Sequence, residues 1–195
     1  MKVKNLYNLI LKRRTIRLFR QKKVSIKTIK KIINAARLAP SAGNLQFIEY
    51  LVIDKKPLTE KIFETLHWAA YIAPKRNPPL SQRPTFYIII LINKERTATP
   101  NLRDIGAAAE NILLSLVSFK LGGCWLLNID KEKLKNILKI SDKFEIDSMI
   151  AGGYPDEAPI LEVSEKNFKY WLDEKNILHV PKRPLKNIFH YNERV

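Results

Sequence analysis

Apolar residues recur along the chain with two periods, and these periods separate helices from strands. Spacings of three and four residues predict amphipathic helices, whereas short alternating or continuous apolar runs predict strands. We expect helices near residues 1–12, 25–38, 57–66, 102–121 and 130–140. We expect strands near residues 47–54, 85–93, 124–127 and 144–151. Residues 156–195 carry no strong period.

The ends of these elements carry their own signals. Ser25 and Asp130 are typical N-caps, whose side-chain oxygens accept a backbone N–H of the first helical turn. Pro40 ends the helix before it, because the residue preceding a proline avoids the helical region. The glycine pair at residues 122–123 predicts the end of the long helix. Residues 152–155, with the sequence G-G-Y-P, predict a turn.

Three further segments bear on function. The helix at residues 102–121 is apolar over most of its circumference, so it lies in the core or at a subunit interface, and both remain open. Residues 179–195 form an extended apolar tail, which needs a surface of its own chain or of a partner. Residues 74–84 contain four prolines and predict a loop, and such loops often act as lids or binding loops.

Length and composition indicate one domain. The chain has 195 residues, 46% of them hydrophobic, and a single cysteine, Cys124. The longest apolar run, residues 86–92, is much shorter than the about 20 residues that cross a bilayer, and no secretory signal is visible. We therefore expect a cytoplasmic protein with no membrane partner, no internal disulfide and no cysteine-based metal site.

The formal net charge is +16. Such an excess attracts nucleic acid, an acidic membrane surface or phosphorylated small molecules. The lysines are distributed over most segments instead of forming one block. A solvated basic surface is therefore favoured over a nucleic-acid-binding stripe.

The first candidate binding segment is Arg13-Arg14-Thr15-Ile16-Arg17. A guanidinium is a planar fork that matches phosphate, and charge-assisted hydrogen bonds contribute roughly 1.5–3 kcal/mol each. Adjacent residues of a helix point apart, so two of these arginines converge on one anion only where the segment is extended or turning. The alternative is a basic helix terminus that interacts with the helix dipole.

The second candidate is the small, polar turn at residues 40–46, with the sequence P-S-A-G-N-L-Q. Its small residues let backbone amides approach a ligand closely. Asn44 and Gln46 can both donate and accept hydrogen bonds, which suits the edge of a heteroaromatic ring. The alternative is an ordinary loop between a helix and a strand.

The usual catalytic sets are absent from the sequence. His67, His179 and His190 lack metal-ligand spacing, so we expect no metal site. No glycine-rich phosphate loop is present, and Cys124, in an apolar strand, is expected to serve packing. A chain without an acid–base set can still be an enzyme when a cofactor carries the chemistry.

Six motifs, taken in order, resemble those of the nitroreductase family of flavin-dependent oxidoreductases. They are R-R-T-I-R at 13–17, A-R-L-A-P-S-A-G-N-L-Q at 36–46, D-I-G-A-A-A-E-N-I-L-L at 104–114, L-G-G-C-W at 121–125, I-A-G-G-Y-P-D-E at 150–157 and K-R-P-L-K-N-I-F-H-Y at 182–191. The resemblance covers essentially the whole chain. It implies one FMN-binding domain over residues 1–195 with an α+β, three-layer fold, a central mixed β-sheet flanked by helices.

The resemblance also implies an intertwined homodimer with two FMN sites at the subunit interface. The long helix would lie at that interface, and the tail at about 179–195 would wrap around the partner. Both implications agree with a helix that is apolar on most sides and a tail that lacks a surface.

The family's FMN-binding positions match five groups of residues here. Arg13, Arg14 and Thr15 match the family's residues that hold the FMN phosphate and ribityl chain. Arg17 matches the family's cation near flavin N1 and the C2 carbonyl. The segment donated by the partner subunit matches Pro40, Ser41, Ala42 and Asn44. The backbone over the flavin ring matches Leu126, Leu127 and Asn128. The basic pair that closes on the phosphate matches Lys182 and Arg183. Arg17 stays charged at any working pH, so it would stabilise the anionic reduced flavin.

The reaction implied by the resemblance is ping-pong. NADH or NADPH gives a hydride to flavin N5 and leaves, and an electron-poor acceptor such as a nitroaromatic, a quinone or free flavin takes its place. We expect His67, Trp68 and Tyr71, with the loop at 74–84, to shape the acceptor pocket. The alternative is that they are ordinary helix and loop residues.

Two other functions remain as alternatives. One is a specialised flavin enzyme of the same fold, either dehalogenase-like or flavin-consuming. The other is a basic nucleic-acid-binding protein, which predicts exposed aromatic residues along a basic stripe and an affinity that falls steeply with salt. The long apolar helix and the missing nucleic-acid motifs favour a flavin enzyme without a nucleic-acid partner.

Overall fold

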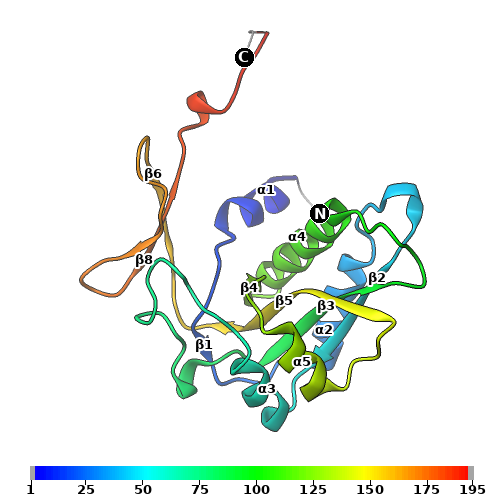
Figure 1. The fold of residues 1–195 in the computed structure, drawn as a ribbon. Coiled ribbons are helices and arrows are strands. Elements are labelled where there is room, and N and C mark those ends of the chain that lie inside the picture. The colour runs from blue at the N-terminus through cyan, green and yellow to red at the C-terminus, as the bar shows by residue number, and fades with distance from the viewer. Residues whose placement is uncertain (1–2, 193–195) are drawn as a thin grey trace.

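The computed structural model describes residues 3–192, with side chains from residue 6 onward. A five-stranded sheet lies at the centre, and helices cover both of its faces (Figure 1). The helices are α1 (Val3–Lys12), α2 (Ile26–Ala36), α3 (Lys56–Phe63), α4 (Leu102–Ser118) and α5 (Lys131–Leu138). The strands of the sheet are β1 (Phe19–Arg20), β2 (Ile48–Ile53), β3 (Phe86–Asn93), β4 (Gly122–Leu126) and β5 (Phe144–Pro155). The fold is the three-layer α+β arrangement expected.

The long strand β5 organises the sheet. It pairs with β3 along most of its length, with β4 near its end, and with β1 through Tyr154 and Pro155. The outer strand β2 pairs with β3. All four ladders are antiparallel, and the mixed character comes from a parallel bridge between Thr15 and Gly123. This bridge joins the arginine segment to the sheet.

Two apolar clusters fill the space between the layers. All eight residues of β3 are buried, as its continuous apolar run predicts. Because successive strand residues point to opposite faces, the even-numbered residues Phe86 to Ile92 pack with α2 and α4. The odd-numbered residues Tyr87 to Leu91 pack with α3 and α5 on the other face. The sheet is therefore a rigid platform, covered on both sides.

The predicted helix starts are confirmed. Ser25 Oγ accepts the backbone N–H of Thr28 at 3.1 Å, and Asp130 Oδ1 accepts that of Lys133 at 3.0 Å. Each satisfies one donor that the first turn of a helix leaves unpaired. The helices and strands expected up to residue 151 are all present, with bounds shifted by a few residues.

Both expectations about glycine pairs were wrong. The long helix ends at Ser118, and Lys120 takes the left-handed conformation, with φ of 59°. Gly122 and Gly123 lie inside β4, and residues 152–155 continue β5 instead of turning. A Cβ atom at Gly122 would come within 2.5 Å of the side chain of Ile16. Gly122 is therefore needed for close packing of the arginine segment on the sheet, and Gly123 for close packing of Leu116 of α4, which a Cβ atom would approach to 2.6 Å.

The last residues form a second, smaller sheet that sequence periodicity did not predict. It consists of β6 (Ile160–Val163), β8 (Leu178–Lys182) and β7 (Trp171–Leu172), in that order. After β8 and a 3₁₀ turn at Leu185–Asn187, the chain extends away from the rest of the molecule (Figure 1). Other 3₁₀ turns are at Ala42–Asn44 and Leu80–Gln82. In the described part of the chain, no helix has the length and hydropathy needed to span a membrane.

Candidate functional site

The arginine segment is extended, and backbone contacts hold it against β4. The N–H of Arg13 still donates to the carbonyl of Leu9 in α1, at 2.9 Å. Ile16 N–H then donates to the Gly123 carbonyl at 3.0 Å, beside the Thr15 bridge. Residues 14–17 are thus outside the helix. An extended segment is the condition under which more than one of these arginines can serve the same anion.

Arg13 and Arg14 have different surroundings. The Arg13 Nε lies 3.2 Å from a carboxylate oxygen of Glu110 on α4, in a half-exposed ion pair. Arg14 lines a hollow of about 320 Å³ next to the end of α4, together with Lys12 and Lys120. Burial, followed by the charge of Arg13, lowers the pKa of Arg14. The two arginines diverge, as successive residues of an extended segment do.

Arg17 has the properties of a ligand-binding residue. Its guanidinium lies over the ring of Tyr170, with 5.0 Å from Cζ to the ring centre. Its Nε is buried and has no hydrogen-bond partner in the described structure. Throughout residues 6–192, no carboxylate forms an ion pair with it. An unpaired buried donor is costly, so this group fits an acceptor supplied by a ligand.

The carboxylate of Glu157 lies directly behind Arg17. It accepts the backbone N–H of Arg17 and, at 3.0 Å, that of Leu18. Its second oxygen pairs with Arg76, and both side chains of this ion pair are almost fully buried. Sequence reasoning missed Glu157 and Arg76. The signal available was the carboxylate that closes the motif I-A-G-G-Y-P-D-E.

The turn at residues 40–46 is held by a buried carboxylate on α4. Asp104 Oδ2 accepts the hydroxyl of Ser41 at 2.8 Å and the backbone N–H of Ala42 at 2.9 Å. Gly43 has φ of 59°, which favours glycine there. Pro40 and Asn44 are exposed. The turn is therefore held in place and outward-facing, and Asp104 is a third residue that sequence reasoning missed.

The segment after β4 comes close to the end of α3. Leu126 is buried, whereas Leu127 and Asn128 are exposed. The Asn128 carbonyl accepts the backbone N–H of His67 at 3.2 Å. The structure thus brings one expected acceptor-pocket residue next to the expected flavin-contacting backbone.

The other two expected pocket residues differ from each other. Trp68 is only 4% exposed and stacks on Phe63, with 5.7 Å between ring centres, so its ring belongs to the core. Tyr71 is exposed and packs on Tyr170 at 5.1 Å. Since Tyr170 also covers Arg17, Tyr71 is connected to the arginine site through one aromatic ring. Tyr170 lies in a segment without periodicity and was not predicted.

The basic pair near the C-terminus is exposed. Lys182 ends β8, and the Arg183 guanidinium donates to the Asn187 carbonyl at 2.8 Å. Within the described chain, neither side chain forms a hydrogen bond or ion pair with residues 13–17. One copy of the chain therefore does not bring the two basic groups together.

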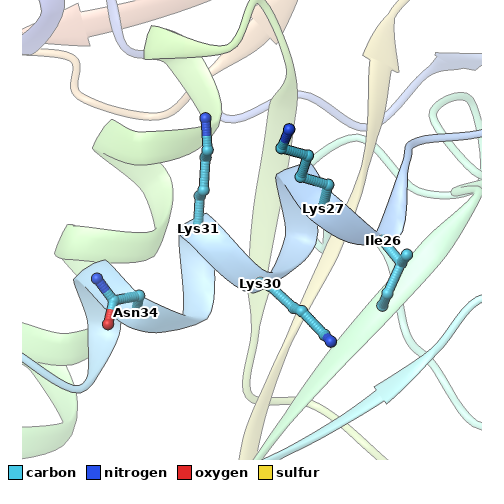
Figure 2. Close-up of a pocket in the computed structure, with 5 residues that line it drawn as sticks. All are labelled: Ile26, Lys27, Lys30, Lys31 and Asn34. Atoms are coloured by element: carbon cyan, nitrogen blue, oxygen red, sulfur yellow. The ribbon is translucent and has the colours of Figure 1, made fainter.

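A hollow of about 490 Å³ on α2 offers no comparable site (Figure 2). All its lining residues come from one helix, and they are Ile26, Lys27, Lys30, Lys31 and Asn34. Lys30 points away from Lys27 and Lys31 in Figure 2, so these ammonium groups do not converge. Elsewhere in the described residues, no group of three or more His, Cys, Asp or Glu side chains could hold a metal ion.

Comparison with known proteins identifies the family. The model of the nitroreductase family matches residues 10–154, which include the arginine segment, the polar turn and all of the central sheet except Pro155. This chain belongs to the nitroreductase family. Among curated proteins, it is similar to one of Archaeoglobus fulgidus, named provisionally as an NADH dehydrogenase/NAD(P)H nitroreductase. The two are 29% identical over 170 residues, covering 81% of this chain and 90% of the relative.

Solved structures of other members of the nitroreductase family have the same fold. One, from Desulfovibrio desulfuricans, is described provisionally as a nitroreductase and was solved in complex with FMN. It superposes with a TM-score of 0.73 at 21% identity, covering 97% of this chain and 98% of its own. An FMN-dependent nitroreductase of Clostridium difficile R20291 gives 0.68 at 23% identity, covering 96% and 99%. At these identities the likeness establishes the fold.

Proposed function

We propose that this nitroreductase-family protein is an FMN-dependent oxidoreductase of a single domain over residues 1–195. Bound FMN would accept a hydride at N5 from NADH or NADPH and deliver it to an electron-poor acceptor, in a ping-pong reaction. The acceptor class is a nitroaromatic, a quinone or a flavin. Family membership supports the oxidoreductase class, and the relatives named for NAD(P)H and FMN support this donor and cofactor.

The observation that carries the proposal is the state of Arg17. Its backbone is held by Glu157, its Nε is buried without a partner among the described residues, and none of their carboxylates pairs with its guanidinium. An anionic ligand that accepts hydrogen bonds, such as the N1–C2=O edge of a flavin, would supply both an acceptor for the Nε and a negative charge for the guanidinium. A cation placed there would stabilise the reduced cofactor, which is the role we assign to Arg17.

The rest of the FMN site is assigned by position. Arg13 and Thr15 would bind the phosphate and ribityl chain. Arg14 would contribute less than Arg13, because it lines a separate hollow. The backbone of Leu126, Leu127 and Asn128 would pass over the ring, beside His67.

Completion of the site requires a second copy of the chain, so we propose a homodimer. The partner would supply Pro40, Ser41, Ala42 and Asn44, whose turn faces outward. Its tail would bring Lys182 and Arg183 to the phosphate. The apolar side chains of the tail support this arrangement, since Leu185, Ile188, Phe189 and Tyr191 are all more than half exposed in one chain.

For the acceptor pocket we propose Tyr71 and His67. We add Tyr170, because its ring packs on Tyr71 and lies against Arg17. Tyr170 and Tyr71 form an aromatic wall beside Arg17 that suits a flat, electron-poor ring. Trp68 would support this wall from the core and would not touch the acceptor. The cytoplasmic location remains a prediction from the sequence.

Arg17→Ala tests the assignment. The loss of one charge-assisted contact, about 1.5–3 kcal/mol, should weaken FMN binding about 10- to 100-fold and slow flavin reduction. Arg20→Ala is the matched control, because Arg20 is exposed and pairs with Asp156 at 3.3 Å. Fluorescence titration with FMN and stopped-flow reduction by NADH measure the two effects. An Arg17→Ala protein that binds and reduces FMN like Arg20→Ala would reject the role of Arg17.

A further inference from the structure

Glu157 contacts the backbone of Arg17 from a position just after β5. It follows the last residues of β5, which pair with β1, and Asp156 N–H continues that pairing by donating to the Leu18 carbonyl at 2.9 Å. The Glu157 side chain then folds back onto the same segment. One of its oxygens accepts the N–H groups of both Arg17 and Leu18. Two consecutive amides on one oxygen fix the direction in which the Arg17 side chain leaves the backbone.

Arg76 supplies the charge that balances Glu157. The Arg76 and Glu157 side chains are 7% and 5% exposed, and they form an ion pair through the second carboxylate oxygen. The other terminal nitrogen of the Arg76 guanidinium donates to the Asn176 carbonyl at 3.2 Å. A buried carboxylate needs such a partner, because an unpaired buried charge is strongly unfavourable. The proline-rich loop that carries Arg76 therefore contributes a cation that neutralises the carboxylate beside the Arg17 backbone.

Pairing of Arg76 with Glu157 leaves the positive charge of Arg17 without a carboxylate partner among the described residues. Arg76 forms an ion pair with the Glu157 carboxylate, whereas Arg17 contacts that carboxylate through its backbone N–H. The positive charge of Arg17 therefore remains available to a ligand, with the Tyr170 ring against its guanidinium. Arg13 differs, because its charge is already shared with Glu110.

We propose that Glu157 is a positioning residue for Arg17, and that Arg76 leaves the Arg17 charge free by neutralising Glu157. The inference rests on the proposed FMN function. It adds two residues, one from the loop at 74–84 and one after β5, that tune the cofactor without touching it. A purely structural role for Glu157 would have the same effect whether or not Arg17 is present.

A double-mutant cycle separates the two roles. Glu157→Ala should weaken FMN binding about tenfold in the otherwise native protein, and less than twofold in an Arg17→Ala background, because positioning matters only while Arg17 is present. Fluorescence titration with FMN gives the four dissociation constants, and thermal unfolding shows that each variant is folded. Equal losses in both backgrounds, or no loss in either, would overturn the proposal.

A second variant covers the case in which Glu157→Ala does not fold. Arg76→Gln removes the positive charge that neutralises Glu157 and leaves the bonds from the Arg17 and Leu18 N–H groups to Glu157 in place. Because the negative charge of Glu157 then acts on Arg17, the midpoint potential of bound FMN should shift downward. Arg20→Gln removes the same charge from an exposed neighbour and should leave the potential unchanged. An unchanged potential in Arg76→Gln would overturn the proposal. A native protein that binds no FMN would instead reject the proposed function, so the two failures are distinguishable.

Discussion

The body of the protein, residues 3–155, and its C-terminal region, residues 156–192, are stabilised in different ways. In the body, two apolar clusters cover the sheet, and β3 is buried over its whole length. In the C-terminal region, a polar cluster replaces an apolar core. His179 lies between the carboxylates of Glu162 and Asp173 and stacks on Trp171, with 4.2 Å between ring centres. The tail that follows exposes most of its apolar side chains.

The difference indicates a division of tasks. Burial of apolar surface stabilises the body by roughly 25 cal/mol per Å², so the body has what it needs to fold within one chain. The tail at the end of the C-terminal region leaves most of its apolar side chains exposed in one chain, so we propose that it packs on another copy. Function would require both regions, because basic residues of the proposed phosphate site occur in each.

Removal of the tail is the most severe test of this division. Deletion of residues 181–195 should leave the body folded but yield a monomer that binds FMN at least 100-fold more weakly, since two basic residues and the apolar tail are lost together. Size-exclusion chromatography with light scattering and an FMN titration provide the readout. A normal dimer with native FMN content would contradict the proposed wrapped tail.

Paired substitutions to alanine compare the two regions directly. Ile89→Ala leaves a cavity in the fully buried strand β3 and should lower the free energy of unfolding by about 2–5 kcal/mol. Phe189→Ala in the tail should change it by less than about 0.5 kcal/mol at protein concentrations where the chain is monomeric. Instead, it should raise the dimer dissociation constant. Equal destabilisation by both substitutions in urea unfolding would remove the distinction.

Basic residues in each region test whether both contribute to one site. Arg13→Ala and Arg183→Ala should each weaken FMN binding about 10- to 100-fold, because each removes one charge-assisted contact. Neither should alter the unfolding of the body. Lys186→Ala is the control, since its exposed ammonium pairs with Glu165 at 3.1 Å. Loss of affinity in only one of the two variants would place the phosphate site within one region.

The polar cluster predicts the smallest effect, a pH dependence confined to the small sheet. Burial alone would lower the pKa of His179, but hydrogen bonds to Glu162 and Asp173 outweigh it and hold the pKa above its usual 6.5. A raised pKa stabilises the fold fully below 6.5, and this contribution disappears as the pH rises through the folded-state pKa. Amide exchange in β7 and β8 should therefore be faster at about pH 8.5 than at about pH 5.5, after correction for intrinsic rates. His179→Gln should abolish the difference, and a difference that persists would assign it to another group.

The success of sequence reasoning follows the same division. A continuous apolar run predicted β3, helical periodicity predicted α4, and side-chain chemistry predicted the caps at Ser25 and Asp130. These signals are local or lie within one layer. The glycine pairs misled it, since Gly122 is needed for contact with Ile16, more than 100 residues away in the chain. The small sheet was missed because polar contacts such as those of His179 leave no period.

In the candidate site, the sequence showed which residues could bind a ligand but not which carboxylates hold those residues in place. The arginine segment and the polar turn were visible as clusters of donors. Their supports, Glu157 and Asp104, were not, because a carboxylate that accepts backbone N–H groups looks like any surface acid in the sequence. The burial of Trp68, against the exposure of Tyr71, likewise depends on how the chain after α3 turns.

The visible absorption spectrum of the purified native protein tests the central claim most directly, combined with identification of the released chromophore and anaerobic addition of NADH. We predict flavin bands from about one FMN per chain in a dimer, bleached by NADH and restored by a quinone. A colourless protein that also fails to bind added FMN would contradict the account and leave the +16 charge to be explained by another anionic partner.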